Sequence, residues 1–357
     1  MDAFGIDRFK KTLLSEIQKS SNIFITGHLS PDFDSIGACM GLYTIGKYYG
    51  KKCYIVVDDD PITIEPGIKT ILDANHDQYS FVTKKEAIAF QRENTLLMVT
   101  DVNKKDMICF HDMLEEFSSI VVIDHHLGDE HSIPGKSFIH QQVSSASEII
   151  SYLLFSCKIP VDASLANYLL AGINLDTKRY KQNTTSQTHD ISKQLMDCGA
   201  DIDYVNHLFL EEFESFCRVS HLMINGTIIK KYSESMAPIQ VSFTLNREQP
   251  KSIYGKEDYA KAADRMLKFN GIDASFALGY IDEENIHISA RGGKKVNVGK
   301  IMESMNGGGN YQCAAAKVKS SDIFLLEQEL MEKVPLGLPK EERIYEEPPT
   351  IKIKKIH

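Results

Sequence analysis

The feature that most constrains the fold is an alternation of short apolar segments with helical patterns over the first two hundred residues. The apolar segments are rich in β-branched residues and largely apolar throughout, as strands buried on both faces of a sheet must be. The predicted strands are residues 22–26, 53–57, 95–100 and 119–123. Helices are predicted at residues 34–49, 105–116, 144–156, 163–175 and 185–198. Such alternation requires right-handed crossovers and predicts an α/β fold, with a mostly parallel sheet and flanking helices.

The pattern changes in the second half of the chain, where strand-like segments predominate. These strands are predicted at residues 224–231, 239–245, 274–281 and 286–290, with helices at 257–268 and 297–305. At 357 residues the chain is long for a single hydrophobic core. We therefore expect a first domain, a helical connector, a smaller α+β domain and a flexible tail rich in proline and charge. Their expected ranges are residues 1–200, 201–223, 224–334 and 335–357.

Acidic residues and histidines follow directly on several of the predicted strand ends. They stand after the first, third and fourth strands and at the end of the apolar helix 163–175. In chain order they are His28, Asp32, Asp34, Asp101, Asp124, His125, His126 and Asp176. Because ligands of parallel sheets lie at the carboxyl ends of the strands, we expect these side chains to gather at one edge of the sheet.

Each of these groups alone has an ordinary structural explanation. Asp32 and Asp34 could form a turn and cap the helix that follows, since Asp favours both positions. A pair such as His125-His126 is more often a surface or core pair than a metal site. Taken together, five aspartates and three histidines crowd one edge, and like charges that close cannot all stay ionised without cations. Two divalent metal ions resolve that conflict. Mixed carboxylate and imidazole ligands favour Mn²⁺, with Mg²⁺ and Co²⁺ as alternatives.

Composition excludes several other classes of protein. The formal net charge of -9 argues against a long nucleic-acid partner, which requires a broad basic surface. No apolar run is long enough to span a membrane, and the N-terminus lacks the layout of a signal peptide. The seven cysteines include no C-x-x-C pair, so zinc sites and disulfide frameworks are not indicated. We expect a cytoplasmic protein without membrane contact, and the sequence is compatible with a homodimer.

The order of the motifs resembles the DHH phosphoesterase superfamily. The motifs are H-x-x-P-D-x-D-S-I-G from His28, the strand-terminal Asp101, D-H-H from Asp124 and N-x-D-T from Asn174. That superfamily includes RecJ-type nucleases, oligoribonucleases, family II pyrophosphatases and cyclic dinucleotide phosphodiesterases. The second half resembles the DHH-associated domain that supplies the substrate pocket. The closest resemblance is to the catalytic half of membrane-anchored cyclic di-AMP phosphodiesterases, so a stand-alone soluble version is expected.

The resemblance implies roles for the first cluster of residues. One metal would be held by His28, Asp32 and Asp101. The other would be held by Asp34, Asp101, His125 and Asp176, with Asp101 bridging the two ions. His126 would lie beside the scissile phosphate as a hydrogen-bond donor, so that His126 and Asp101 are the expected catalytic residues.

The resemblance also implies substrate contacts. The residues concerned are Arg291, the glycine run Gly307, Gly308 and Gly309, the following Asn310, and the pair Ser144 and Ser145. Glycine lets backbone N–H groups approach an anion, and the guanidinium fork matches a phosphate. A plain turn and a surface arginine are the alternatives. Asn310 stands where relatives carry His, and Gln182-Asn183-Thr184 stand where relatives carry Arg, so substrate preference is less constrained than chemistry.

The leading hypothesis is hydrolysis of cyclic di-AMP to pApA, with onward cleavage to AMP left open. Within catalysis, the alternatives are an oligoribonuclease or pApA hydrolase acting on linear short RNA, and a pyrophosphatase. The Gly307–Asn310 loop and the serines suit a nucleotide better than pyrophosphate. A non-catalytic cyclic dinucleotide sensor is the alternative of another class, although a sensor need not retain the six predicted metal ligands together with His126.

Overall fold

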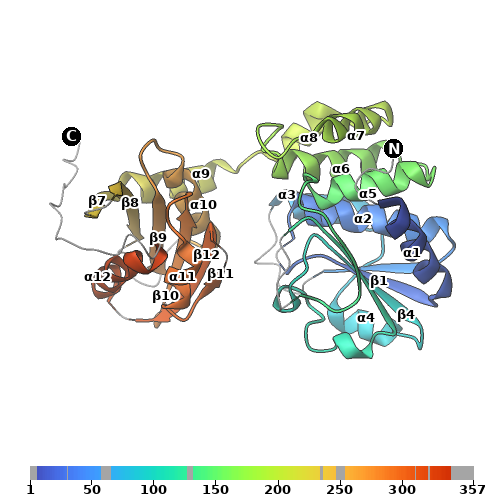
Figure 1. Cartoon of the computed structure of the whole chain (residues 1–357), viewed down its shortest axis with the longest axis horizontal. Coiled ribbons are helices and arrows are strands. Elements are labelled where there is room, and N and C mark those ends of the chain that lie inside the picture. The colour runs from blue at the N-terminus through green and yellow to red at the C-terminus, as the bar shows by residue number, and fades with distance from the viewer. Residues whose placement is uncertain are drawn as a thin grey trace. The chain divides into compact units, whose positions relative to one another are not determined.

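The computed structural model describes residues 6–29, 31–57, 66–126, 132–233, 236–246, 254–309, 311–320 and 322–338. The chain divides into two compact units, Met1–Leu210 and Glu211–His357 (Figure 1). Each unit has its own six-stranded sheet. Within the described residues, no helix has both the length and the apolar character needed to cross a membrane.

The sheet of the first unit is parallel throughout, as the sequence predicts. Its strand order is β3-β2-β1-β4-β5-β6. The strands are β3 Phe81–Val82, β2 Lys52–Val56, β1 Asn22–Thr26, β4 Thr95–Thr100, β5 Ser119–Asp124 and β6 Lys136–Ile139. The four predicted strands are its centre, β2-β1-β4-β5, and the short outer strands β3 and β6 were not predicted. Parallel pairing brings the carboxyl ends of β1, β4 and β5 to one edge.

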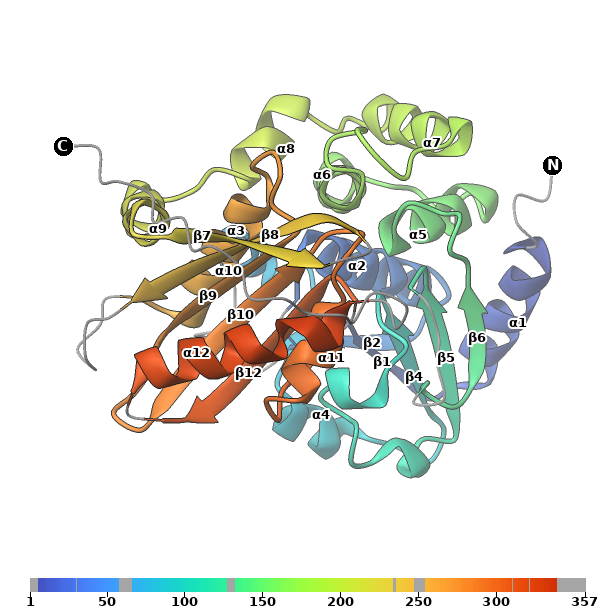
Figure 2. The ribbon, with the colours of Figure 1, turned by 60° about the vertical axis from the view of Figure 1, so that its left-hand side comes forward.

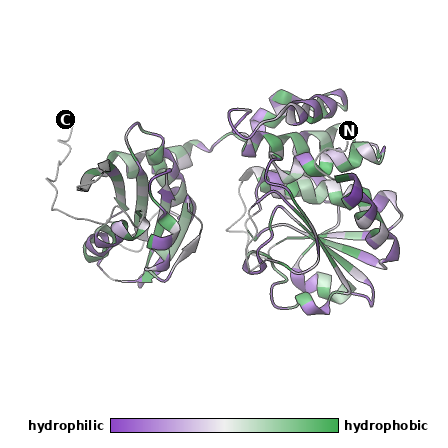
Figure 3. Cartoon of the chain, viewed as in Figure 1, coloured by the Kyte–Doolittle hydropathy of each residue, from purple (hydrophilic) through white to green (hydrophobic). Residues whose placement is uncertain are grey.

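Both faces of this sheet are buried, because successive side chains of each strand point to opposite faces. Ile23 and Ile25 of β1 belong to the hydrophobic cluster that includes most of the helices, and Phe24 belongs to a second cluster with α4 Lys84–Phe90. The helices of the first cluster are α1 Ile6–Lys19, α2 Phe33–Tyr48, α3 Pro66–Asn75, α5 Ala146–Ser156, α6 Ala163–Asp176, α7 Ser186–Asp197 and α8 Ile202–Leu208. Helices α1 and α7 show both hydrophilic and hydrophobic residues along their length (Figure 3).

The helix predicted at residues 105–116 is wrong. The structure has two short 3₁₀ turns there, Lys105–Met107 and Leu114–Glu116, with irregular chain between them. Ile108 and Phe110 are both fully buried although they are only two residues apart. An extended chain places such residues on one face, whereas a helix does not. Packing of this segment against the sheet therefore overrides its helical pattern.

The second unit is an α+β domain with a mixed sheet, ordered β11-β12-β10-β9-β8-β7. Strands β8 and β9 are parallel and the other neighbours are antiparallel. The strands are β7 Thr227–Ser233, β8 Met236–Asn246, β9 Ala274–Tyr280, β10 Asn285–Gly292, β11 Gly308–Gly309 and β12 Cys313–Lys319. Of these, β11 and β12 were not predicted.

Helices cover both faces of the second sheet (Figure 2). Helices α9 Phe213–Ile224 and α10 Lys256–Leu267 pack on one face, and α11 Val298–Glu303 and α12 Ile323–Lys333 pack on the other. The predicted connector 201–223 contains α8 and nearly all of α9. A 3₁₀ turn, Val334–Gly337, begins the predicted tail, and residues 339–357 lie outside the described residues.

Candidate metal centre

Asp32 has two roles that the sequence presented as alternatives. It is the N-cap of α2, because its Oδ1 atom accepts hydrogen bonds from the backbone nitrogens of Asp34 and Ser35, both at 3.0 Å. Its other oxygen, Oδ2, lies 3.7 Å from Nε2 of His28. The cap uses one oxygen and fixes the carboxylate, which leaves the second oxygen available to a cation beside His28.

Asp34 is held by the start of another helix. Its carboxylate is fully buried and accepts hydrogen bonds from the backbone nitrogens of Ala146 and Ser147, both at 2.7 Å. These N–H groups belong to the first turn of α5, where unpaired donors and the helix dipole favour a negative charge. The N-terminus of α5 therefore orients Asp34, an arrangement that the sequence did not reveal.

The same turn contains Ser144 and Ser145, for which the sequence predicts substrate contacts. Both residues are buried, at 1% and 0% exposure. Ser145 is the N-cap of α5 and accepts a hydrogen bond from the backbone nitrogen of Glu148 at 3.1 Å. The Ser144 hydroxyl and backbone nitrogen donate to the Glu148 carboxylate. Through these contacts the serines support α5 and, through it, Asp34.

Asp101 lies at the centre of the cluster, directly after β4. Its backbone φ of 61° is left-handed, a conformation that Asp tolerates better than most residues and that is common at functional sites. Oδ1 of Asp101 lies 3.4 Å from Nε2 of His125, and Oδ2 lies 3.5 Å from Nε2 of His28. One carboxylate thus faces both histidines, as the predicted bridging position requires.

His125 faces the remaining acidic residues. Its Nε2 atom lies 3.0 Å from Oδ2 of Asp176, the last residue of α6, and 3.8 Å from Oδ2 of Asp34. Asp34, Asp101, His125 and Asp176 form one group whose ligand atoms lie within 4.8 Å of one another. His28, Asp32 and Asp101 form a second such group. The two groups share Asp101, and together they contain the six residues that the sequence predicts as metal ligands.

Two buried atoms of the cluster show that these residues fit metal ions. Oδ1 of Asp101 and Nε2 of His125 make no hydrogen bond of acceptable geometry to the described part of the chain, although they lie 3.4 Å from each other. Buried polar atoms are normally paired, and an unpaired one calls for an explanation such as an ion. Carboxylate and imidazole ligands suit divalent ions of the Mn²⁺ type. The donor set therefore fits two divalent cations.

The pKa values of the cluster also favour bound cations. Burial lowers the pKa of both His28 and His125, but the neighbouring carboxylates outweigh it and raise them to about 10 and about 11. Burial, with Asp101 and Asp176 nearby, raises the pKa of Asp34 well above its usual value. Burial acts in the same direction on Asp101, yet both histidines hold its pKa below the usual range. Without cations, protonated His28 and His125 offset part of the carboxylate charge.

His126 lies beside this pair of groups, with Nδ1 at 3.8 Å from Oδ1 of Asp101, and belongs to a third possible ligand group with Asp101, Asp124 and His125. Its Nδ1 atom lies 2.8 Å from Oδ1 of Asp124, and its side chain is 57% exposed. Asp124 is fully buried and also accepts hydrogen bonds from the His125 backbone nitrogen and from Nδ2 of Asn103. The hydrogen bond to Asp124 raises the pKa of His126. Asn103 was not predicted from the sequence, where its one signal is its position two residues after Asp101.

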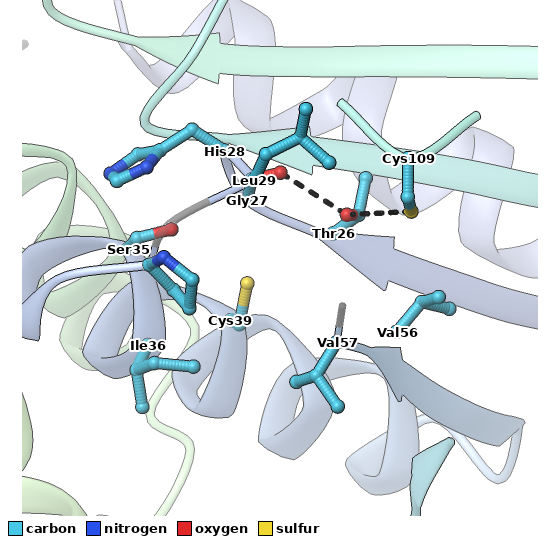
Figure 4. A pocket seen from close by; sticks show the side chains of 11 residues that line it. Thr26, Gly27, His28, Leu29, Ser35, Ile36, Cys39, Val56, Val57 and Cys109 are labelled. Atoms are coloured by element: carbon cyan, nitrogen blue, oxygen red, sulfur yellow. Dashed lines mark hydrogen bonds between the residues drawn. The ribbon is translucent and has the colours of Figure 1, made fainter. Parts of the chain in front are cut away.

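A small pocket opens beside His28, lined by the carboxyl ends of β1 and β2 and the first turns of α2 (Figure 4). Thr26 Oγ1 lies 3.6 Å from Sγ of Cys109 at one side of the pocket. Burial raises the pKa of the Cys39 thiol well above its usual value. The thiol stays protonated and is therefore a poor metal ligand. The pocket thus adds no ligand to the cluster beyond His28.

The substrate contacts predicted in the second unit are placed together by the sheet. Arg291 of β10 pairs in register with Cys313 of β12, and Gly309 pairs with the next residue, Ala314. The Arg291 guanidinium donates to Oδ1 of Asp264 at 2.8 Å and to the carbonyl oxygen of Ala290 at 3.1 Å. Asn310 lies outside the described residues.

Packing explains two of the three glycines. A Cβ atom on Gly307 would lie 2.2 Å from the carbonyl oxygen of Ala315. Gly309 has a φ of 140°, and a Cβ there would lie 2.4 Å from Cα of Ala314. A Cβ on Gly308 would meet no atom within 4 Å among the described residues. The close approach of β12 thus requires glycine at positions 307 and 309, whereas position 308 has room for a side chain among the described residues.

Comparison with known proteins gives relatives for most of the chain. The cyclic-di-AMP phosphodiesterase GdpP of Bacillus subtilis is 31% identical over 313 residues, which are 86% of this chain and 46% of that protein. The cyclic-di-AMP phosphodiesterase PdeA of Listeria monocytogenes is 30% identical over 327 residues, which are 89% of this chain and 48% of that protein. The chain therefore spans about half the length of these curated relatives.

Solved structures share the fold. An exopolyphosphatase-related protein from Bacteroides fragilis superposes with a TM-score of 0.74 at 20% identity, over 92% of this chain and 97% of that one. RecJ from Thermus thermophilus, solved in complex with Mn²⁺, superposes with a TM-score of 0.51 at 10% identity, over 91% of this chain and 53% of that one. At these identities the likeness concerns the fold alone.

Two family models match the chain in the same order as the two units. Residues 22–173 match the N-terminal domain of the DHH family, and residues 239–334 match the DHHA1 domain. The first match contains the ends of β1, β4 and β5, with His28, Asp101 and His125, and the second contains Arg291 and the glycine run. The chain therefore contains a DHH-family N-terminal domain in its first unit and a DHHA1 domain in its second.

Proposed function

We propose that the chain is a metal-dependent phosphodiesterase that hydrolyses cyclic di-AMP to the linear dinucleotide pApA. The observation that carries the proposal is the pair of ligand groups that share Asp101. A site for two ions close together suits displacement at phosphorus. Two relatives named as cyclic-di-AMP phosphodiesterases, matched over 86% and 89% of this chain, support the choice of substrate.

The chain's own residues hold and orient the site. We assign one divalent ion to His28, Asp32 and Asp101, and the other to Asp34, Asp101, His125 and Asp176, with Mn²⁺ as the preferred metal. When bound, such ions supply an activated water and neutralise charge on the phosphate. The backbone N–H groups of α2 and α5 hold Asp32 and Asp34 before any ligand arrives. Such support from outside the ligand set keeps the carboxylates in place for catalysis.

In this proposal, His126 contacts the substrate and does not bind a metal ion. Asp124 holds its Nδ1 atom, which leaves Nε2 as the nitrogen that can face a ligand. The exposed imidazole donates from Nε2 to a non-bridging or leaving oxygen of the scissile phosphate. Withdrawing charge from an oxygen on which it develops is a large contribution to most phosphoryl and acyl transfers.

The second unit supplies recognition. We assign the catalytic role to residues 1–200 and the substrate pocket to residues 224–334, joined by the connector 201–223. Arg291 offers a guanidinium to the phosphate that is not being cleaved, and the open position at Gly308 allows a ligand close to the backbone. Asn310 adds an amide that hydrogen-bonds either a base or a phosphate.

Purified protein should be tested with Mn²⁺ on cyclic di-AMP, pApA, short RNA and pyrophosphate in parallel, with products separated by chromatography. Conversion of cyclic di-AMP to pApA as the fastest reaction is the expected result, and AMP appearing later would show onward cleavage. Faster loss of pApA or RNA with cyclic di-AMP untouched would overturn the substrate assignment. Binding of cyclic di-AMP without turnover would make the protein a sensor.

A further inference from the structure

Asn103 lies two residues after Asp101, in the loop that leaves β4, and only 2% of its surface is exposed. We infer that Asn103 is a positioning residue for catalysis: it fixes Asp124, which in turn fixes the imidazole of His126. The inference rests on the proposed phosphodiesterase activity and deepens it. Asn103 belongs to neither metal-binding group, and no part of its side chain needs to contact the substrate.

The Asn103 amide donates to two acceptors at once. Its Nδ2 atom lies 2.6 Å from Oδ2 of Asp124 and 3.2 Å from the carbonyl oxygen of His126. The other carboxylate oxygen of Asp124 accepts from the backbone nitrogen of His125 at 2.8 Å and lies 2.8 Å from Nδ1 of His126. One amide group thus fixes both the side chain that orients the imidazole and the backbone that carries it.

Because Asp124 is buried, its position depends strongly on the hydrogen bond from Asn103. Asp124 is fully buried, and a buried carboxylate oxygen that loses its donor is left with a large desolvation cost. The carboxylate would relieve that cost by turning toward another donor or by drawing in water. Either change weakens its hold on Nδ1 of His126. The imidazole would then rotate more freely and present Nε2 to the scissile phosphate for less of the time.

The position calls for an amide rather than a carboxylate of the same shape. An aspartate at residue 103 would place a second negative charge beside Asp124 and would have no hydrogen to offer it. It would also face the carbonyl oxygen of His126 with an acceptor instead of a donor. Asn103→Asp therefore changes the hydrogen bonds and charge while keeping the volume.

The loop itself is held by main-chain bonds that do not involve this side chain. The backbone nitrogen of Ile133 donates to the Asn103 carbonyl oxygen at 2.7 Å, and the Asp101 nitrogen donates to the Ile123 carbonyl oxygen at 3.0 Å. Lys104 also pairs with Ser132 through an isolated bridge. Substitutions of the Asn103 side chain should therefore leave the path of the loop intact and report on Asp124 and His126.

The kinetic test compares Asn103→Ala and Asn103→Asp with the wild-type full chain, using Mn²⁺ and cyclic di-AMP. We expect kcat to fall about 10–100-fold, as for other residues that orient catalytic side chains from behind, with KM and Mn²⁺ affinity within about twofold. The matched control is Asn75→Ala. Asn75 is also buried, and its amide donates at 2.7 Å to both the Ile71 carbonyl oxygen and the Tyr168 hydroxyl. That variant should lose stability but keep kcat.

A second readout does not depend on turnover. In the metal-free protein, the hydrogen-bonded Nδ1 proton of His126 should give a resolved downfield proton resonance in nuclear magnetic resonance spectra, assigned by its absence in His126→Gln. The resonance should be lost to exchange with water in both Asn103 variants and kept in Asn75→Ala. The isosteric Asn103→Asp keeps the test available if Asn103→Ala folds poorly.

The outcomes separate the inference from the proposed function. A wild-type kcat in a folded Asn103→Asp protein overturns the positioning role. A fall in kcat that is matched by an equal rise in KM, or by an equal loss of Mn²⁺ affinity, overturns it too. A wild-type protein that does not hydrolyse cyclic di-AMP overturns the proposed function instead. The proton resonance then still decides whether Asn103 controls the Asp124–His126 pair.

Discussion

The metal cluster of the first unit and the Arg291–glycine region of the second were both predicted as functional, and the structure explains them to different degrees. Around Asp101, packing does not account for the chemistry, because Oδ1 of Asp101 and Nε2 of His125 are buried and make no hydrogen bond of acceptable geometry to the described residues. In the second unit, Arg291 pairs with Asp264 and two of the glycines are required by β12.

The difference shows what makes a residue diagnostic of function. A side chain whose polar atoms are already satisfied by its own domain can be kept for the fold alone. A buried polar atom that makes no hydrogen bond destabilises the folded protein, so its presence indicates a ligand. The cluster is therefore strong support for metal binding, whereas the second region depends more on the family likeness.

The largest effect should come from Asp101, the residue common to both ligand groups. Asp101→Asn keeps the shape and the tolerance for left-handed φ, but it removes the charge that two cations would share. Losing several kcal/mol of stabilisation corresponds to a fall in kcat of about 10³-fold or more. Hydrolysis of cyclic di-AMP at saturating Mn²⁺ measures it. The control Asp112→Asn removes an aspartate that pairs with Lys84 instead, and it should retain full activity.

Metal affinity should depend steeply on pH. The pKa values of His28 and His125 lie near 10 and 11 in the metal-free protein, so both imidazoles hold protons at pH 7. A metal ion binds only the deprotonated nitrogen, and binding must therefore release these protons. Affinity should rise with pH, by about tenfold per pH unit for each proton released.

Calorimetry in two buffers of different ionisation enthalpy counts the protons released at pH 7. Release should be close to two per protein and should fall to about one in His28→Gln. Metal binding without proton release would mean that the imidazoles are not ligands. The charged residues of the cluster would then pair with one another, as Arg291 and Asp264 do in the second unit.

The glycine run offers a direct test of packing against function. Gly307→Ala would force a Cβ into the Ala315 carbonyl oxygen, and overpacking of this kind costs about 1–3 kcal/mol. Gly308→Ala meets open space among the described residues and should change the free energy of unfolding by less than about 0.5 kcal/mol. Urea unfolding measures both. If Gly308→Ala alone raises KM while stability is unchanged, the run serves the ligand as well as the fold.

The sequence predicted the central parallel sheet and the meeting of the acidic residues, because both follow from strong local patterns. Buried strands read as apolar runs, and parallel pairing fixes which strand ends meet. It did not predict the short edge strands β3 and β6, or the irregular segment around Ile108 and Phe110. Those are determined by what they pack against rather than by their own periodicity.

Side-chain support was the part of the site that the sequence could not supply. The pairing of Asp34 with the N-terminus of α5 joins residues 112 positions apart, and the contact of Asn103 with Asp124 joins residues 21 positions apart. Neither contact follows a helical or strand period. The support that the buried Ser144 and Ser145 give to α5 is likewise a contact that no periodic pattern in the sequence predicts.

The smallest expected effect concerns Arg291, where the fold and the ligand compete for one side chain. Nε of Arg291 donates to Asp264 and Nη1 donates to the Ala290 carbonyl oxygen, and the guanidinium still has further N–H groups to offer a phosphate. Arg291→Lys removes the fork geometry but keeps the charge, so KM for cyclic di-AMP should rise about tenfold, equivalent to about 1.4 kcal/mol, with kcat unchanged. Asp264→Asn leaves the arginine in place and should change KM by no more than about threefold, since the pair is partly exposed and weak.

Steady-state kinetics on both Arg291→Lys and Asp264→Asn, with urea unfolding alongside, distinguishes the role of Arg291 in recognition from a role in stability. A loss of stability in Arg291→Lys without any change in KM would make Arg291 a structural residue and would leave recognition to Gly308 and Asn310.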